Sequence, residues 1–243
     1  MRLCLYPWEF LLTVVDDAKK EYTTLQIDRD TITDIPVLGI GGGEAGKTRT
    51  QIARAYTYGT GMTDSSVNTV EAVSNLLGGA GIDHYATLSL KAIGILNGDV
   101  DGVEVTIVDD FSKIDDTMTG TLTLSDEQAQ NYVRARQEMD DDTNIARMVR
   151  QRDYFTKWID RFSEKAADDD TFATHTVLDI SDYYVSDLPP DILANFAVAM
   201  TEYKDNGIIS IKGTSKTVDG YAAFYADRKA LEKQVIKLLY EKK

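Results

Sequence analysis

The sequence predicts an α/β (α+β) fold, a single-domain sandwich in which helices flank a central mixed β-sheet. Segments rich in β-branched and aromatic residues alternate with segments of helical periodicity. They do not follow a strict strand–helix–strand rhythm, which favours a mixed sheet over a purely parallel one. With 243 residues, 43% of them hydrophobic, the chain is long enough to bury a large core.

The first half of the chain begins with a predicted hairpin. Residues 10–17 and 21–29 read as two strands joined by a polar turn. Ser65 or Ser66 can cap the next helix, which we expect to bury a face that includes Val67 and Val73. A short helix follows Ser89, and residues 102–110 then predict a strand.

The second half begins with Ser125 and Gln128, which have the spacing of a capping box at a helix start. A further helix is expected from about Asn144. Its predicted buried stripe consists of Ile145, Met148, Phe155, Trp158, Ile159 and Phe162. Pro189 and Pro190 introduce another helix, because proline is accepted in a helix's first turn. Residues 207–213 predict a strand and residues 228–240 a last helix.

The charge balance limits the partners that the protein can have. The formal net charge of −14 argues against a nucleic-acid partner, since neutralising phosphates needs a broad basic surface. A local basic pocket on such a protein would instead attract one defined anion. The apolar run at residues 3–15 contains Pro7 and Glu9 and is shorter than the ~20 residues of a membrane span, so we expect no membrane segment in this chain.

One short stretch matches a phosphate-binding loop. "GGGEAGKT", residues 41–48, fits G-x-x-x-x-G-K-[ST], and "VTIVDD" further on resembles the strand and aspartate that support magnesium in P-loop NTPases. The alternative is a glycine-rich hairpin tip between two strands. Pro36 in the preceding strand and the short helix available afterwards favour that alternative. We therefore expect Lys47 in a loop that faces water.

Arginines gather in the middle of this acidic chain, where five of the eleven lie between Arg134 and Arg152. On a helix that starts near Asn144, Arg147 and Gln151 share a face. In an extended segment Arg134 and Arg136 would point the same way. Two such pairs can clamp a diphosphate, because guanidinium groups bind phosphate oxygens bidentately. The other interpretation is a solvated charged helix with Asp–Arg pairs.

The order of these motifs is similar to that of the LytR–CpsA–Psr family of cell-envelope proteins. The family's R-x-R, acidic loop and arginine–glutamine motif match "RAR", the aspartates after it and "NIARMVRQ". "LQIDRDT", "ARAYTYGTG" and "LNGDVDGVEVTI" resemble further family segments in the same order. The resemblance covers residues 10–162, followed by a typical C-terminal part at 170–243. It also suggests a single domain over 1–243 whose N-terminal family segment is missing.

The resemblance implies an enzyme of the Gram-positive cell wall. Such phosphotransferases move a glycopolymer, for example wall teichoic acid or capsule, from a polyprenyl-diphosphate carrier to peptidoglycan at the extracytoplasmic face of the membrane. Arginines and Mg²⁺ would neutralise the charge that develops on the diphosphate. Two alternatives remain at this point, a non-catalytic binder of polyprenyl phosphates or glycopolymers and the P-loop NTPase.

The resemblance also implies roles for individual residues. As catalytic residues it suggests Arg29, Asp30, Asp142 and Arg147. For the diphosphate it suggests Arg29, Arg134, Arg136, Arg147, Gln151, Gln51 and Arg54. Only Glu9 lies near a position where the family holds its metal, so we expect Mg²⁺ to bind weakly or only together with the ligand.

Overall fold

The computed structural model describes residues 1–6, 10–39, 43–136, 139–141 and 143–241. Its contacts divide the chain into two compact units. The sheet unit consists of Met1–Thr87, Val185–Leu188 and Lys204–Lys243, and the helical unit of Leu88–Tyr184 and Pro189–Tyr203.

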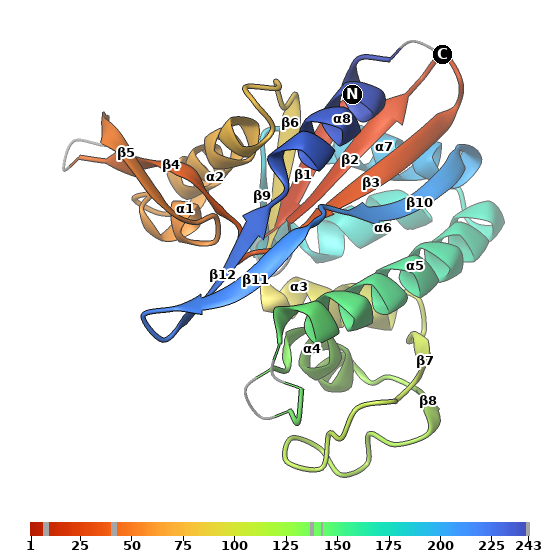
Figure 1. Ribbon diagram of the computed structural model, residues 1–243. Coiled ribbons are helices and arrows are strands. Elements are labelled where there is room, and N and C mark those ends of the chain that lie inside the picture. The colour runs from red at the N-terminus through yellow and green to blue at the C-terminus, as the bar shows by residue number, and fades with distance from the viewer. Residues whose placement is uncertain (7–9, 40–42, 137–138, 142, 242–243) are drawn as a thin grey trace. The chain divides into compact units, whose positions relative to one another are not determined.

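A six-stranded sheet forms the centre of the sheet unit (Figure 1). Its strands are β1 (Arg2–Tyr6), β2 (Phe10–Asp16), β3 (Glu21–Ile27), β6 (His84–Leu88), β9 (Tyr184–Ser186) and β10 (Lys204–Ser210). They follow the order β10-β3-β2-β1-β6-β9, in which β1–β2 and β2–β3 are antiparallel but β1–β6 and β10–β3 are parallel. The predicted mixed sheet with helices is therefore confirmed.

The predicted hairpin near the start of the chain is β2–β3. Lys20 adopts a positive φ of 54° in its turn, and Asp16 accepts hydrogen bonds from the next backbone amides at Ala18 and Lys19. One face of the strands buries Leu12 and Leu25 in the core of the sheet unit, together with side chains from its helices. Those helices are α1 (Arg54–Thr57), α2 (Met62–Leu76) and α8 (Arg228–Leu239).

Helix α2 differs from its prediction in two ways. It begins three residues before Ser65, so neither Ser65 nor Ser66 is its cap, and both are buried within the helix. Val67 is exposed, whereas Asn68 is buried and donates hydrogen bonds to the carbonyls of Pro36 and Ala55. A polar side chain with two good acceptors takes the inward position that apolar periodicity had assigned to valine.

Two separate hairpins complete the sheet unit (Figure 1). In the first, β4 (Ile32–Leu38) pairs antiparallel with β5 (Glu44–Gln51). The second joins β11 (Gly213–Val218) to β12 (Tyr221–Ala226) through Asp219 and Gly220. Both turn residues have positive φ, 50° and 80°, which is the geometry of a two-residue type I′ turn and explains the Asp-Gly pair.

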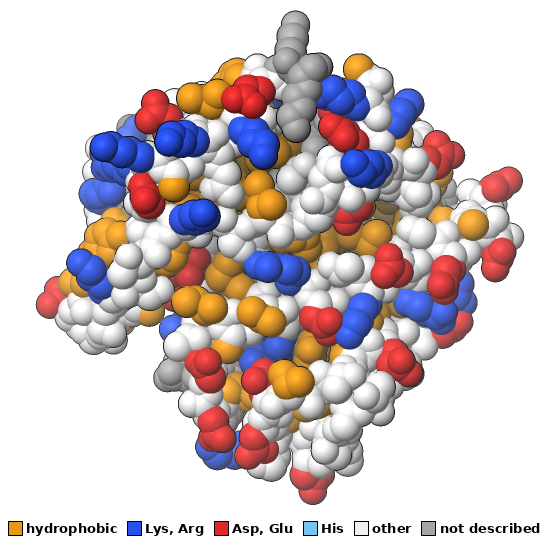
Figure 2. All heavy atoms as spheres, turned by 45° about the vertical axis from the view of Figure 1, so that its right-hand side comes forward, with side chains coloured by type: hydrophobic (Ala, Val, Ile, Leu, Met, Phe, Trp, Pro, Cys, Tyr) orange, Lys and Arg blue, Asp and Glu red, His pale blue; other side chains and the backbone are white. Residues whose placement is uncertain are grey.

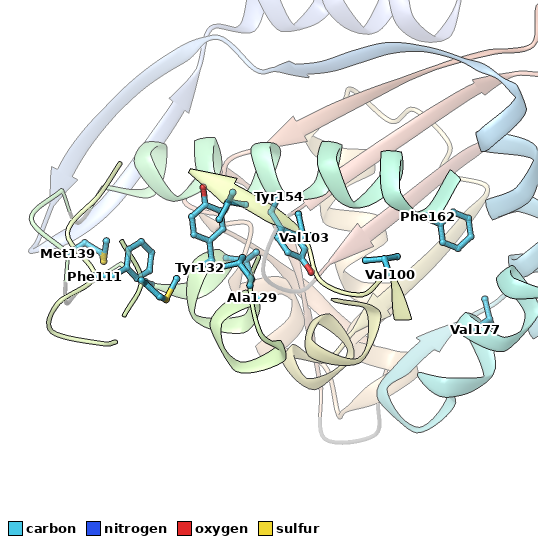
Figure 3. Close-up of a cluster of buried hydrophobic side chains, with 14 of the residues drawn as sticks. Val100, Val103, Phe111, Ala129, Tyr132, Met139, Tyr154, Phe162 and Val177 are labelled. Carbon is cyan, nitrogen blue, oxygen red and sulfur yellow. The ribbon is translucent and has the colours of Figure 1, made fainter. Parts of the chain in front are cut away.

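The helical unit has a core of its own. Its elements are α3 (Leu90–Asp99), β7 (Glu104–Thr106), β8 (Thr121–Thr123), α4 (Asp126–Arg134), α5 (Asn144–Asp168), α6 (Phe172–Asp179), a 3₁₀ turn (Ser181–Tyr183) and α7 (Pro190–Glu202). The predicted capping box at Ser125 and Gln128 is present. Figure 3 shows Phe111 beside Tyr132 at one end of the core, with ring centroids 5.9 Å apart.

Helix α5 begins at the predicted residue, but part of its predicted buried stripe is wrong. Ile145 is 54% exposed, while Arg147, Arg150 and Gln151 are among the buried residues. Met148 is buried as predicted, but the inward face here also holds polar side chains, of which Arg150 and Gln151 have partners on α4. The stripe holds further along, at Phe162.

No helix among the described residues is long and apolar enough to cross a membrane.

On the face drawn in Figure 2, acidic and basic side chains are interspersed with hydrophobic ones. The arginines of the predicted site must therefore be judged from their individual contacts.

Candidate functional site

In the sheet unit the predicted site residues gather where β3 ends. Asp28 accepts a hydrogen bond from the backbone N–H of Asp30 at 2.8 Å, and its carbonyl accepts one from the N–H of Thr31 at 2.9 Å. This turn fixes the backbone beside Arg29. The buried Asp30 carboxylate accepts a hydrogen bond from Nε2 of Gln51 at 3.0 Å. Two residues predicted for the site, far apart in sequence, are thus in contact.

The backbone of the β11–β12 hairpin forms hydrogen bonds with Gln51 and Asp30. Nε2 of Gln51 also donates to the carbonyl of Ala222 at 2.5 Å, and the N–H of Phe224 donates to the carbonyl of Asp30 at 2.8 Å. Sequence reasoning assigned nothing to this hairpin. Its Asp219-Gly220 pair between alternating residues is the signal that would have found it.

Arg29 and Arg54 differ in their surroundings. The Nε atom of Arg29 is buried and has no hydrogen-bond partner among the described residues. A buried donor without an acceptor is costly, by ~1–3 kcal/mol. Arg54 is exposed, and its guanidinium carbon lies 5.8 Å from the centroid of the Tyr221 ring. Both arginines can therefore accept an anion without first breaking an ion pair to a described carboxylate.

In the helical unit, the end of α4 is bound to α5. A helix leaves its last carbonyls without N–H partners. Arg150 donates from Nε to the carbonyl of Tyr132 at 3.1 Å and from a terminal nitrogen to that of Ala135. Gln151 donates from Nε2 to the carbonyl of Val133 at 3.0 Å. Arg150 and Gln151, adjacent on α5, thus donate hydrogen bonds to three backbone carbonyls around the start of the R-x-R segment.

The positive charge of Arg150 is also paired. Its Nη1 lies 2.6 Å from Oδ2 of Asp109, and the arginine side chain is only 3% exposed. A cation at the C-terminus of α4 is further favoured by the helix dipole. Sequence reasoning missed both residues, although Arg150 lies three positions after Arg147 and so shares its side of the helix. Asp109, in the segment that resembled an NTPase magnesium strand, is instead the partner of this arginine.

The other arginines of the cluster lie at the ends of the two helices. Arg134 is the last residue of α4 and is exposed, so the condition of an extended segment, under which Arg134 and Arg136 would point the same way, is not met at Arg134. Arg136 follows two residues later and is partly buried. Arg147 is buried in the second turn of α5 and donates a hydrogen bond to Oδ1 of Asn144. Gln151 contacts the carbonyl beside Arg134, so part of the predicted group does come together.

The start of α5 has the features of an anion-binding terminus. The side chain of Thr143 caps the helix by accepting the N–H of Ala146 at 3.2 Å. The hydrogen bonds that Thr143 donates to Asp141 keep the pKa of that carboxyl below its usual value. The first turn contains no acidic residue, so nothing in it opposes the helix dipole's preference for a negative group.

Two predicted residues, Glu9 and Asp142, lie outside the described part of the chain. A metal site does not emerge from the rest. Among the described residues, no group of three or more histidines, cysteines or carboxylates is placed to hold a metal ion. Asp30, the predicted carboxylate that follows Arg29 in the sequence, has Oδ1 bound by Gln51. The expectation that Mg²⁺ binds weakly or only together with the ligand stays a prediction.

The P-loop interpretation is wrong. Glu44–Gln51, which holds the motif's lysine, is a strand, and Lys47 pairs with Pro36 of β4 across the ladder. The expected position of Lys47 in a loop is likewise wrong, although its side chain is exposed and bound to Glu71 at 3.0 Å. The phosphate loop needs free backbone N–H groups leading into a helix, which this strand does not offer.

The comparison with protein families settles the relationship. The LytR_cpsA_psr family model matches residues 9–239. The chain belongs to the LytR–CpsA–Psr family. No curated protein matches it.

Solved structures show the same fold. TagT bound to LIIa-WTA aligns with a TM-score of 0.73 at 21% identity, over 98% of this chain and 88% of that one. B. subtilis TagV aligns with a TM-score of 0.70 at 22% identity, over 100% and 97%. The protein gbs0355 from Streptococcus agalactiae aligns with a TM-score of 0.79 at 17% identity, over 100% and 88%. At these identities the likeness establishes the fold.

Proposed function

We propose that this protein is a cell-wall glycopolymer phosphotransferase that acts on a polyprenyl-diphosphate-linked polymer at the extracytoplasmic face of the membrane. The family match over residues 9–239 is the observation that carries the proposal. TagT, a structural neighbour, has been solved bound to LIIa-WTA and to LI-WTA. The acceptor that we propose is peptidoglycan.

In the proposed reaction a hydroxyl of the acceptor attacks the phosphorus that carries the glycopolymer. A new phosphodiester bond forms, the bond to the second phosphate breaks, and polyprenyl phosphate leaves with the electron pair. The hydroxyl proton passes to a base, for which Asp142 stays our prediction. Charge grows on the leaving phosphate, so fixed guanidinium groups would lower the barrier.

The contacts within each unit suggest how the chain's residues divide this work. Arg29 has a buried donor that no described residue uses, which a phosphate oxygen would satisfy. Asp30 orients Gln51 toward the same place, and we propose that Arg54 binds the outer oxygens. In the helical unit, Arg134, Arg136 and Arg147 would bind the diphosphate, while Arg150 holds α4 in place for them.

Magnesium remains part of the proposal only as an ion that arrives with its ligand. Mg²⁺ prefers several hard oxygens in an octahedral arrangement. Diphosphate oxygens would supply what the described side chains lack, and Glu9 is our predicted protein contribution. When bound, the ion would add charge neutralisation on the diphosphate.

The test is the affinity for a polyprenyl diphosphate, measured by calorimetry with and without Mg²⁺. Arg134→Ala should weaken binding by ~1.5–3 kcal/mol, the value of a charge-assisted hydrogen bond, without lowering stability because Arg134 is exposed. Arg228→Ala, in the exposed first turn of α8, is the matched control and should have no effect. We expect Mg²⁺ alone to give no detectable heat, and to strengthen binding when the diphosphate is present.

Two outcomes would contradict the proposal. If the wild-type chain does not bind polyprenyl diphosphates at all, the arginines are not a clamp. If it binds them but releases no polyprenyl phosphate when the lipid-linked polymer and peptidoglycan are supplied, the protein is the non-catalytic binder instead.

A further inference from the structure

The outward face of the β11–β12 hairpin carries aromatic side chains. Tyr221 is 63% exposed and Tyr225 is 41% exposed, and both lie on the same side of β12 because side chains alternate along a strand. Phe224, on the opposite side, is 7% exposed and belongs to the core of the sheet unit. The hairpin therefore has one face anchored in the core and one face that presents tyrosine rings.

Two cations accompany these rings. Nζ of Lys216 lies 5.7 Å from the centroid of Tyr225, and the guanidinium of Arg54 lies 5.8 Å from that of Tyr221. At such distances the electron-rich face of an aromatic ring attracts a cation. Among the described residues, neither Lys216 nor Arg54 forms an ion pair with a carboxylate. Their charge is not neutralised locally.

The cations on the β4–β5 hairpin of the same unit do form ion pairs with carboxylates. On β5, Lys47 is bound to Glu71 at 3.0 Å and Arg49 to Asp34 at 3.2 Å. In a chain of net charge −14, carboxylates are plentiful, yet none among the described residues pairs with Lys216 or Arg54. Lys216 and Arg54 therefore keep their charge available to an anion, whereas the two cations on β5 are already paired with carboxylates.

The same hairpin borders the candidate site. Its backbone binds Gln51 and Asp30 through Ala222 and Phe224, as described above. Arg54, which we assigned to the diphosphate, also lies on the ring of Tyr221. The tyrosine face therefore lies next to Arg54, Gln51 and Asp30, three residues of the candidate site.

We propose that this face, formed by Tyr221, Tyr225, Lys216 and Arg54, binds the anionic glycan chain of the polymer that is being transferred. The inference rests on the proposed function for the identity of that polymer. Flat aromatic faces pack on the C–H faces of sugar rings, and the two cations bind the phosphate groups between them. Four residues along a strand separate the tyrosines by about 13 Å. That spacing is wider than one sugar ring and fits a chain of several units.

The experiment measures the affinity of the full chain for lipid-free wall teichoic acid, a phosphate-linked glycan. Tyr225→Ser and Lys216→Gln are the informative variants, since they leave Arg54 and its tyrosine in place. Each should weaken binding about fivefold, and Lys216→Gln should also reduce its dependence on salt. Tyr240→Ser is the matched control, because Tyr240 is 59% exposed under the guanidinium of Arg2 but lies on α8's end, away from the hairpin.

A second pair of measurements separates this proposal from the function on which it rests. Tyr225→Ser should bind a sugar-free polyprenyl diphosphate as the wild type does. If the hairpin variants bind the teichoic acid unchanged while the diphosphate still binds, the surface proposal is wrong and the function stands. If the variants lose polymer affinity although no diphosphate binds, the surface proposal stands and the function fails.

Other occupants of the face would be revealed by the same variants. Tyrosines also suit a membrane interface. Binding to phosphatidylglycerol vesicles that Tyr225→Ser abolishes, with no binding of the teichoic acid, would overturn the proposal. So would dimerisation of the wild type that the same substitution abolishes, since a second copy would then cover the face.

Discussion

Two arginines, one in each unit, are both buried in part but differ in how their hydrogen bonds are used. Arg150 in the helical unit gives three of its nitrogens to three acceptors, namely Asp109 and the carbonyls of Tyr132 and Ala135. Arg29 in the sheet unit keeps a buried Nε for which no described residue provides an acceptor. Arg150 is therefore engaged within the fold, while Arg29 keeps the donor that we propose for the diphosphate. The difference shows that an arginine's role follows from its acceptors and not from its place in a motif.

The largest effect expected from this comparison is that of Arg150→Ala. Removing one partner of a buried ion pair leaves Asp109 uncompensated and two backbone carbonyls without their donor, which should lower the free energy of unfolding by ~3–5 kcal/mol. Urea denaturation measures it. Arg150→Met, which keeps the volume, should lose less than Arg150→Ala. Arg29→Ala is the contrasting variant and should not lower the free energy of unfolding, since it removes a buried donor for which no described residue provides an acceptor.

If Arg29→Ala proved as destabilising as Arg150→Ala, the division between a structural and a ligand-binding arginine would fail. A near-neutral Arg150→Ala would equally contradict it, because the end of α4 would then need no support from α5.

A smaller effect on stability is expected at Asp99, where a substitution should raise the free energy of unfolding. This partly buried carboxyl has an Oδ2 without a hydrogen-bond partner among the described residues. Burial, together with the charges of Asp179 and Asp126, raises its pKa from 3.8 to about 6. Between these two values the folded state binds more protons than the unfolded state. Stability therefore falls as pH rises through this window and stays lower at pH 7.

Asp99→Asn removes that penalty. We expect it to raise the free energy of unfolding at pH 7 by about 1 kcal/mol, after allowing for solvent screening of a partly exposed group. Below pH 3.8 the gain should vanish, since Asp99 is then protonated in both states. Thermal melts at both pH values test it. Asp115 is the control of opposite sign, because hydrogen bonds from Thr117 and Gln128 lower its pKa, so Asp115→Asn should lose stability at pH 7.

The sequence predicted the parts of the fold that depend on local patterns. The β2–β3 hairpin, the capping box of α4 and the start of α5 follow from alternation, caps and periodicity, and the structure has all three. It could not predict which side chains of α5 meet the end of α4. That depends on tertiary contacts, and these bury Arg150 while they leave Ile145 exposed. Resemblance supplied the candidate residues, but only the structure separates Arg150 from the arginines around it.

The smallest effect is expected at Lys47, although its motif fits a phosphate loop letter for letter. Its ion pair with Glu71 is exposed on both sides, and such pairs contribute only ~0–1 kcal/mol. Lys47→Ala should therefore shift the unfolding midpoint little. The backbone around it is engaged with β4 across the strand ladder, so it cannot turn its N–H groups toward phosphates. We expect no saturable ATP binding by the wild type in equilibrium dialysis, and unchanged polyprenyl-diphosphate affinity in Lys47→Ala. If the wild type bound ATP and Lys47→Ala abolished that binding, the strand would have to open into a loop. That result would support the phosphate-loop interpretation.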